Sequence, residues 1–295
     1  MSADIQTTAG LEAVLGIVRA AATEAAALVY EGFRKELVVE HKGAVDLVTR
    51  FDRESEALLR RRLGDALPFA VIGEEEGGEA ESIAFYVDPI HGTTNFVHGH
   101  PFWCVSIGLV VNHHPVLGVV ISPPLGVEWS GFTAANGERR AIRRRAENAL
   151  LVSATGGSTR VIEEPCAPSR RAIFEESLLA TGFPYDRRTS LDNNFDAFVA
   201  IKQKCQAVRR CGSAALDLCL VADGTYEGYW ERKVRPWDIA GGIGIVRAAG
   251  GQVTDFEGGE TFLASGRVIA SNGAIHTRLM RELATVAVNQ ASKET

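Results

Sequence analysis

The chain has 295 residues, of which 46% are hydrophobic and 23% charged, and its 31 Lys and Arg against 37 Asp and Glu give a net charge of −6. These proportions exclude a disordered or fibrous protein. The acidic balance argues against a nucleic-acid polymer as partner, because a chain of phosphates requires a basic face. A small anionic ligand remains possible, since local charges and metal ions can override the sign of the net charge.

Apolar runs and cysteines bear on the location of the protein. The longest apolar runs, such as Val116–Ile121, are far shorter than the ~20 residues that a membrane helix requires. Residues Met1–Gly10 lack the basic and then apolar segments of a signal peptide. The 5 cysteines contain no CxxC pair, which predicts neither a disulfide framework nor a zinc ribbon. We therefore expect a reduced, cytoplasmic protein without a membrane segment.

The spacing of apolar residues predicts the elements of the first half in chain order. A helix begins near Leu11, and a second helix covers Arg50–Leu67 and ends before Pro68, which cannot continue it. Short apolar runs separated by Gly, Pro, Asn and His then predict the strands of one sheet. These runs are Phe69–Ile72, Ile83–Val87, Trp103–Val111, Val116–Ile121 and Val127–Phe132.

The middle of the chain begins with a cluster of arginines. The cluster comprises Arg139, Arg140, Arg143, Arg144 and Arg145. It is typical of a solvated hairpin or connection, and the alternative is a rim that attracts an anionic substrate. We then expect a strand at Leu150–Ser153, a linker at Pro165–Arg171, and a helix over Arg171–Thr181 that Gly182 and Pro184 end.

The last third alternates strands and helices. The expected elements are a strand at Ala207–Arg209, a helix at Ala214–Ala222, a strand at Tyr226–Trp230, a helix at Ile239–Ala249, strands near Gln252–Thr254 and Val268–Ala270, and a terminal helix from about Ile275. This order predicts a layered α/β protein. We expect an N-terminal α+β half (residues 1–150) and a C-terminal α/β half (residues 151–295) that form one compact catalytic unit.

Three acidic segments follow or precede apolar elements. They are Gly73-Glu74-Glu75-Glu76, Asp88-Pro89-Ile90-His91-Gly92-Thr93-Thr94-Asn95-Phe96, and Trp237-Asp238-Ile239-Ala240-Gly241-Gly242. Carboxylates at strand ends are where open α/β folds build their sites, and hard oxygen ligands favour Mg²⁺. Taken singly, the first segment could be only a charged turn and Asp238 only a helix N-cap. The glycine turn and threonines after Asp88 predict a helix start whose free N–H groups hold an anion.

Together these segments resemble the inositol monophosphatase family of metal-dependent phosphatases. Its pattern has Gly-Glu-Glu, Asp-Pro-hydrophobic-Asp-Gly-Thr-Thr-Asn-Phe and Trp-Asp-x-Ala-Gly segments. The resemblance extends from about residue 40 to 272 and includes Asp46-Leu47-Val48-Thr49 with Asp52, Gly212-Ser213-Ala214-Ala215, and Gly250-Gly251-Gln252-Val253-Thr254-Asp255. The Thr-Thr-Asn-Phe version is more similar to the inositol-phosphate branch than to the 3′-phosphonucleotide branch.

The resemblance implies a fold, a site and an assembly. The fold is the α-β-α-β-α sandwich of the inositol monophosphatase and fructose-1,6-bisphosphatase type, often a homodimer. Two or three Mg²⁺ ions are implied, the first held by Glu74, Asp88, the Ile90 carbonyl and Thr93, and the second by Asp88 and Asp238. Asp52 and Thr93 would orient the attacking water, with Asp52, Glu74 and Thr93 as the catalytic set. Gly92, Thr93 and Thr94 would hold phosphate, and Glu231, Gly212 and Ala214 the rest of the substrate.

The sequence departs from the family at His91, where the pattern has an aspartate that binds the second metal. Because Mg²⁺ prefers oxygen to nitrogen ligands, three consequences compete. The site could work poorly with Mg²⁺, favour Mn²⁺ or another ion that accepts imidazole, or bind phosphate without turnover. Lithium sensitivity, which the family implies, should be weaker for the same reason.

The sequence therefore predicts a Mg²⁺-dependent phosphomonoester hydrolase that uses a metal-activated water. Phosphate monoesters hydrolyse extremely slowly unaided, and a pair of cations can stabilise both the attacking and the leaving oxygen. The first substrate candidate is inositol-1-phosphate or a similar small polyol or sugar phosphate. Histidinol phosphate, fructose-1,6-bisphosphate and 3′-phosphoadenosine phosphates are alternatives. A catalytically weak phosphate-ligand binding protein is the alternative from another class.

Overall fold

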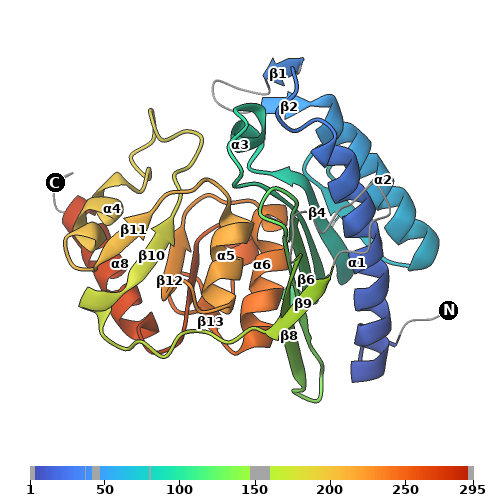
Figure 1. The fold of residues 1–295 in the computed structure, drawn as a ribbon. Coiled ribbons are helices and arrows are strands. Elements are labelled where there is room, and N and C mark those ends of the chain that lie inside the picture. The colour runs from blue at the N-terminus through green and yellow to red at the C-terminus, as the bar shows by residue number, and fades with distance from the viewer. Residues whose placement is uncertain (1–3, 37, 42–46, 80, 147–159, 292–295) are drawn as a thin grey trace.

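The computed structural model describes residues 4–36, 38–41, 47–79, 81–146 and 160–291, and they form stacked layers of helices and sheets (Figure 1). The helices are α1 (Thr8–Tyr30), α2 (Arg50–Ala66), α3 (Thr93–Val97), α4 (Phe195–Lys202), α5 (Ala214–Ala222), α6 (Pro236–Ala249), α7 (Phe262–Ser265) and α8 (His276–Ala291). Two strands, β1 (Val39–His41) and β2 (Leu47–Thr49), pair with each other outside the main sheets.

The main sheets have seven and five strands. In spatial order, the larger contains β3 (Ala70–Gly73), β4 (Ile83–His91), β5 (Cys104–Val111), β6 (His114–Ser122), β7 (Val127–Thr133), β8 (Arg139–Ala146) and β9 (Val161–Pro165). The smaller contains β11 (Ala207–Arg209), β10 (Leu178–Thr181), β12 (Gly228–Glu231), β14 (Val268–Ser271) and β13 (Gln252–Thr254). All pairs of the larger sheet are antiparallel except β3 with β4.

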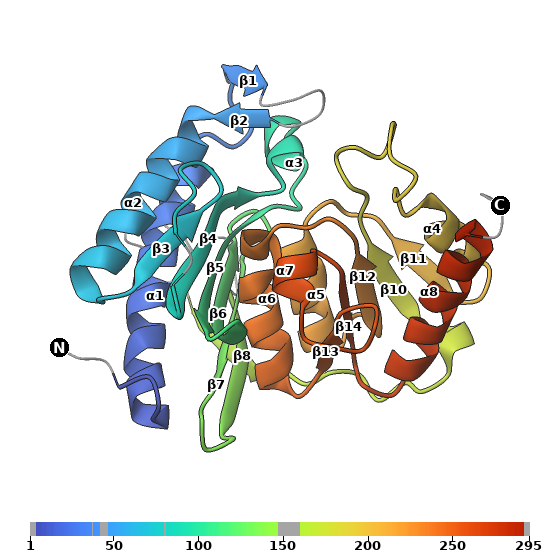
Figure 2. The same ribbon diagram turned by 180° about the vertical axis from the view of Figure 1, so that it is seen from behind.

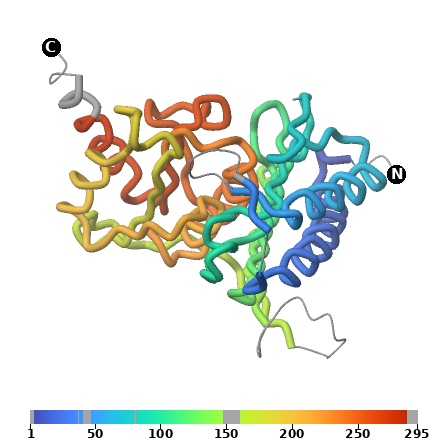
Figure 3. The backbone as a smooth tube through the Cα atoms, turned by 90° about the horizontal axis from the view of Figure 1, so that it is seen from above, coloured from blue at the N-terminus to red at the C-terminus, as the bar shows by residue number. Residues whose placement is uncertain are grey.

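The layers follow the predicted α-β-α-β-α order. Helices α1 and α2 cover one face of the larger sheet, α5 and α6 lie between the two sheets, and α4 and α8 cover the outer face of the smaller sheet (Figure 1). Seen from behind, α7 lies beside α6 (Figure 2). The view from above shows α1 and α8 at opposite ends of the molecule (Figure 3). The predicted fold class is confirmed.

Helix α6 packs on the backbone of the larger sheet, and glycines on both sides make this approach possible. A Cβ atom at Gly118 of β6 would lie 1.9 Å from the Gly241 carbonyl oxygen, and one at Gly244 would lie 2.8 Å from the Leu117 carbonyl carbon. Both distances are shorter than van der Waals contact, so only glycine fits. The close approach brings the start of α6, with Asp238, to the end of β4.

The smaller sheet buries both faces by strict alternation along β12. Trp230 points to the outer helices α4 and α8, while Tyr229 joins the core around α5 and α6. At the end of this strand Glu231 emerges beside Gly182, which follows β10.

The prediction of a helix over Arg171–Thr181 is wrong. The structure has a 3₁₀ turn at Phe174–Glu176, followed by β10, which pairs in parallel with both β11 and β12. Leu179, Ala180 and Thr181 are fully buried in this central strand. Hydrogen bonding on both sides and burial on both faces override a local pattern that also suits a helix.

The arginine cluster forms β8, the second strand of a hairpin with β7, in accord with the hairpin interpretation. Its side chains pair with acids: Arg143 binds Asp223 and Glu164, and Arg144 binds Glu128 and Glu163. The strand expected at Leu150–Ser153 lies outside the described residues. The sequence did not predict β1, β2, β9, α4 or α7.

Among the described residues, α1 alone is long and apolar enough by composition to cross a membrane. In the structure its apolar residues, including Val14, Val18 and Ala22, are buried against α2 and the larger sheet. A helix in the core of a globular protein has the same composition.

Candidate active site

A cavity of about 500 Å³ lies where the ends of β3, β4 and β12 meet the starts of α3, α5 and α6. It brings together every predicted site residue except Asp52. The lining includes Glu74, Asp88, Ile90, His91, Gly92, Thr93, Thr94, Gly212, Ala214, Glu231 and Asp238. Asp52 lies behind this wall, with its Oδ1 atom 3.4 Å from the Thr93 hydroxyl. None of the arginines of β8 lines the cavity.

The end of β4 contains a bulge that places Asp88 and His91 together. Asp88 pairs with Ser106 and His91 with Cys104, so β4 has one residue more than β5 between these positions. The extra residue interrupts the alternation of side chains and turns His91 to the side of Asp88. The His91 Nδ1 atom lies 2.5 Å from Asp88 Oδ2, and Asp88 Oδ1 accepts the Ile90 N–H at 3.1 Å.

Asp238 has two partners, one for each carboxylate oxygen. Its Oδ2 atom accepts the Arg235 N–H at 2.7 Å, so Asp238 caps the start of α6 from the third helical position, while the N-cap position itself belongs to Arg235. Its Oδ1 atom lies 3.7 Å from His91 Nδ1. Ligand atoms of Asp88, His91 and Asp238 all lie within 4.8 Å of one another. Capping therefore does not compete with a role in the cavity.

The electrostatics of this cluster suit a cation. Burial raises the pKa of Asp238, and the charge of Asp88 raises it further. Burial opposes the charged form of His91, but the charge and hydrogen bond of Asp88 outweigh it, so the pKa of His91 is raised. Its Nε2 atom is buried without a hydrogen-bond partner in the described part of the chain. With the imidazole neutral, two carboxylates and one nitrogen form a donor set that fits a divalent cation.

Asp52 occupies the same position in α2 that Asp238 has in α6. Its Oδ2 atom accepts the Thr49 N–H and hydroxyl, both at 2.7 Å, and caps the helix. Its Oδ1 atom is directed to Thr93, whose hydroxyl donates to the Ile90 carbonyl at 3.0 Å. Burial raises the pKa of Asp52 to about 7, against the hydrogen bonds from Thr49 that lower it. A carboxylate with this pKa is suited to accept a proton near neutral pH.

The anion side of the cavity consists of backbone at the starts of α3 and α5. Gly92, with φ 99°, precedes α3, and a Cβ there would lie 3.2 Å from the carbonyl oxygens of Gly212 and Phe102. The Asn95 side-chain amide donates to the carbonyls of Phe102 and Cys211 at 2.7 and 2.9 Å. These bonds hold the two helix starts side by side, where free N–H groups favour a phosphate.

The opposite side of the cavity contains two carboxyl groups, that of the half-buried Glu231 and that of the buried Asp217. Glu231 accepts a hydrogen bond from the Tyr229 hydroxyl at 2.6 Å, and burial raises its pKa. Asp217 of α5 is 1% exposed, lines the cavity, and has a pKa that burial raises well above the ordinary value. The sequence analysis missed Asp217, although its spacing of three residues from Ala214 places both on one helix face.

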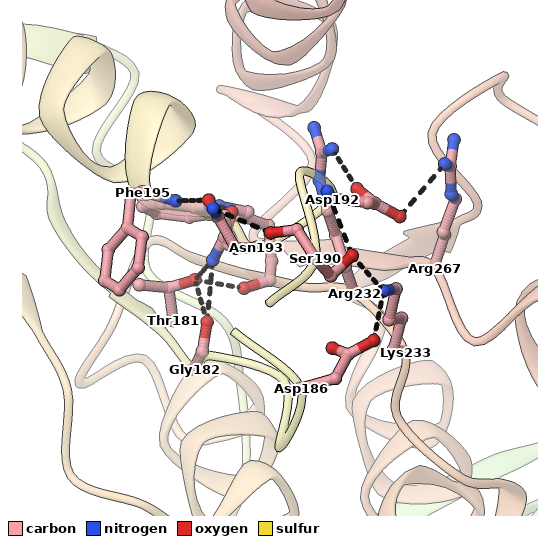
Figure 4. Close-up of polar contacts among 12 residues, drawn as sticks. Thr181, Gly182, Asp186, Ser190, Asp192, Asn193, Phe195, Arg232, Lys233 and Arg267 are labelled. Carbon is pink, nitrogen blue, oxygen red and sulfur yellow. Dashed lines mark hydrogen bonds and ion pairs between the residues drawn. The ribbon is translucent and has the colours of Figure 1, made fainter. Parts of the chain in front are cut away.

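The segment after β10 forms the outer wall of the cavity and includes Phe183, Tyr185 and Arg187. Polar contacts fix this segment to β12 and its extension (Figure 4). Asp192 pairs with Arg232 at 2.5 Å and with Arg267 at 3.3 Å. Lys233 binds Asp186 and Ser190, both at 2.7 Å.

The layered fold, the carboxylate cluster and the converging helix starts together indicate a hydrolase of phosphate esters. Comparison with known proteins then gives the family. The chain belongs to the inositol monophosphatase family, whose profile matches residues 11–288.

Individual relatives agree with this assignment over most of the chain. Inositol-1-monophosphatase of Synechocystis sp. is 39% identical over 282 residues, which cover 93% of this chain and 90% of that protein. Nus factor SuhB of Pseudomonas aeruginosa is 34% identical over 272 residues, with 89% and 92% covered. The structure of inositol monophosphatase from Anabaena (Nostoc) sp. matches with a TM-score of 0.77 at 33% identity, covering 93% of this chain and 96% of that one.

Proposed function

We propose that this protein hydrolyses small polyol or sugar phosphomonoesters, with inositol-1-phosphate as the first candidate, and that it uses divalent cations, Mg²⁺ or Mn²⁺. The observation that carries the proposal is the cluster of Asp88, His91 and Asp238 in one cavity with two helix starts. Bound cations would neutralise the phosphate and favour ionisation of the attacking water. Glu74, Asp88, His91 and Asp238, with the Ile90 carbonyl, would hold them.

Each side of the cavity has its own task in this reaction. The amides at Gly92 and Thr93 bind phosphate oxygens and fix the phosphorus atom. Thr93 holds the attacking water, and Asp52, which lies behind Thr93, accepts the proton of the Thr93 hydroxyl, which takes up the proton of the water in turn. Glu231 and Ala214 orient the leaving alcohol, and the carboxyl group of Glu231 binds its hydroxyl groups. The hydrogen bond between α3 and the segment before α5 fixes the phosphate side of the cavity relative to the alcohol side.

His91 sets the choice of metal in this proposal. A carboxylate at this position would add a negative oxygen ligand, whereas imidazole supplies nitrogen without charge. Mn²⁺ accepts imidazole more readily than Mg²⁺ does. We therefore expect the protein to bind Mn²⁺ more tightly than Mg²⁺. The carboxylate oxygens of Asp88 and Asp238 are available as ligands to either ion.

The test is phosphate release from a panel of esters with Mg²⁺ and with Mn²⁺. The panel contains inositol-1-phosphate, histidinol phosphate, fructose-1,6-bisphosphate, 3′-phosphoadenosine 5′-phosphate and an aryl phosphate. Preferred turnover of inositol-1-phosphate supports the proposal, and preference for another member assigns that substrate instead. Tight binding of inositol-1-phosphate without release from any ester would favour the phosphate-binding alternative, for which the His91–Asp88 contact is the specific observation.

Assembly, domain organisation and location belong to the same proposal. We expect a cytoplasmic homodimer in which residues 1–150 and 151–295 act as one catalytic unit. The packing of α6 on the larger sheet supports a single unit, because an element of the second half fills the core of the first. Sedimentation equilibrium of the purified chain measures the dimer directly.

A further inference from the structure

The turn that carries Glu74 is held by two residues of α2, Glu56 and Arg60, that the sequence motifs do not contain. Glu56 is a fully buried carboxylate. Its Oε2 atom accepts the Glu75 N–H at 2.7 Å, and its Oε1 atom accepts the Glu76 N–H at 3.0 Å. These are the amides that follow Glu74 in the chain, so the peptide group joined to Glu74 is fixed from the helix.

Arg60 completes the attachment. Its guanidinium binds Glu56 Oε1 through Nε at 3.0 Å and through Nη2 at 2.7 Å. The same group donates to the carbonyls of Val71 and Gly77, at 2.7 and 2.6 Å, on either side of the turn. The positive charge offsets the buried carboxylate, so the pair adds no net charge beside the cavity.

The turn itself leaves little room for another arrangement. Gly73 and Gly77 exchange backbone hydrogen bonds of 3.0 and 3.1 Å and close the loop around Glu74. A Cβ atom at Gly73 would lie 2.2 Å from the Glu56 carboxyl carbon. The absence of a side chain at this position lets the carboxylate lie directly against the turn. Glu74 therefore projects into the cavity from a backbone that is fixed on every side.

We propose that Glu56 and Arg60 are positioning residues that set the direction of the Glu74 carboxylate and thereby the affinity of its metal site. The inference rests on the proposed function, in which Glu74 is a metal ligand. Partners of this kind around metal ligands usually contribute about 10–100-fold to metal affinity. A purely structural role would change stability and leave the affinity of the folded protein unchanged.

The experiment measures Mn²⁺ binding by the electron paramagnetic resonance signal of the free ion, for the full chain and four variants. Glu56→Gln keeps the shape but presents an NH₂ group to one of the two amides. We expect about 10–100-fold weaker Mn²⁺ binding and faster hydrogen exchange at the Glu75 and Glu76 amides. Arg62→Met is the matched control, because Arg62 lies on the same helix and pairs with the half-exposed Glu24. It should leave both readouts unchanged.

The remaining variants separate the possible failures. If Glu56→Gln does not fold, Glu56→Asp takes its place, because its shorter side chain reaches at most one of the two amides. Glu74→Gln gives the loss expected from removing the ligand itself. If a folded Glu56 variant has wild-type Mn²⁺ affinity although Glu74→Gln weakens Mn²⁺ binding, the positioning role is overturned and Glu74 remains a metal ligand. Wild-type protein that binds no Mn²⁺ overturns the proposed function, and the positioning role with it.

Discussion

His91 lies between two acids, and the charge it carries there decides what else can occupy the space. In the described structure it acts toward Asp88 as a hydrogen-bonded cation, with its raised pKa as the consequence. A metal ion that binds at the same place must displace the ring proton first. Binding of the second metal should therefore release a proton and weaken as the pH falls.

Replacing His91 by aspartate tests this at the residue scale. His91→Asp restores a negative oxygen ligand within a few ångströms of the cation, and charges this close interact by about 4 kcal/mol in a partly screened site. We expect tighter Mg²⁺ binding, faster Mg²⁺-supported turnover and stronger inhibition by Li⁺, measured by phosphate release against both ions. Unchanged rate, Mg²⁺ dependence and Li⁺ inhibition would mean that His91 is not at the second metal.

Asp52→Asn separates the two tasks of the Asp52 side chain. The amide oxygen of asparagine can still accept the Thr49 N–H, so the start of α2 stays capped. The variant loses the group that accepts the proton, and we expect kcat to fall by about 10²–10⁴-fold with little change in KM or melting temperature. Steady-state kinetics and thermal unfolding measure both. A large drop in stability with an unchanged kcat would mean that Asp52 only caps the helix and has no catalytic role.

At the scale of elements, the contact between α6 and the larger sheet should be the least tolerant of added volume. Gly118→Ala puts a methyl group 1.9 Å from the Gly241 carbonyl oxygen. Overpacking of this kind typically costs about 1–3 kcal/mol of unfolding free energy. It would also move the start of α6, so turnover should fall with stability.

Gly16→Ala in α1 is the matched control, because its added methyl group meets nothing within 4 Å. Alanine in a helix interior should stabilise by about 0.5–1 kcal/mol. Urea unfolding of both variants gives the comparison. Equal stability of the two would mean that α6 can shift from the sheet without cost.

The elements also show where the sequence sufficed and where it did not. The helix of residues 214–222 and the strands from residue 83 to 132 could be predicted because each is a nearly continuous apolar run, and the structure buries these runs almost completely. Helix α4 was missed since only Ala197 and Ile201 are buried in it, while Phe195 and Val199 are largely exposed. The helix prediction for residues 171–181 was wrong because pairing with strands distant in the sequence decides the conformation of this segment.

The site residues also divide into those that the sequence could predict and those that it could not. Motifs of consecutive residues located most of the cavity wall, because glycines and carboxylates at strand ends have few structural alternatives. Glu56 and Asp217 were not found, since each lies inside a helix where an acid is ordinary. Their significance depends on which turn or cavity the tertiary structure brings against that helix face.

For the whole molecule, His276 makes stability depend on pH. It is fully buried at the start of α8, between Thr254 of β13 and Ser271 of β14, with hydrogen bonds of 2.9 Å to each hydroxyl. Thr254 donates its proton to the Asp255 carbonyl, so it accepts from Nε2, and Ser271 donates to Nδ1. In this arrangement the neutral imidazole, with its proton on Nε2, has a partner for each ring nitrogen.

Burial lowers the pKa of His276 from 6.5 to about 4. Between these values the unfolded chain binds the proton and the folded chain does not, so stability falls as pH drops from 6.5 to 4 and this contribution is constant below. The slope from one group is at most about 1.4 kcal/mol per pH unit. Urea unfolding against pH should show a shallower decline for His276→Gln. Parallel curves for the two proteins would assign the acid sensitivity to other groups.

Two of the acids at the cavity are also needed by the fold itself. Asp52 and Asp238 each cap a helix with one oxygen, and the other oxygen is directed to a residue of the cavity wall, Thr93 for Asp52 and His91 for Asp238. A descendant of this protein that stopped catalysing its reaction would still be under selection to keep both acids, because a hydrogen bond of this kind typically contributes about 0.5–1.5 kcal/mol of stability. Asp88, which begins no helix, has no such protection. Among proteins descended from this one, the presence of Asp88 therefore indicates retained catalytic activity better than the presence of Asp52 or Asp238 does.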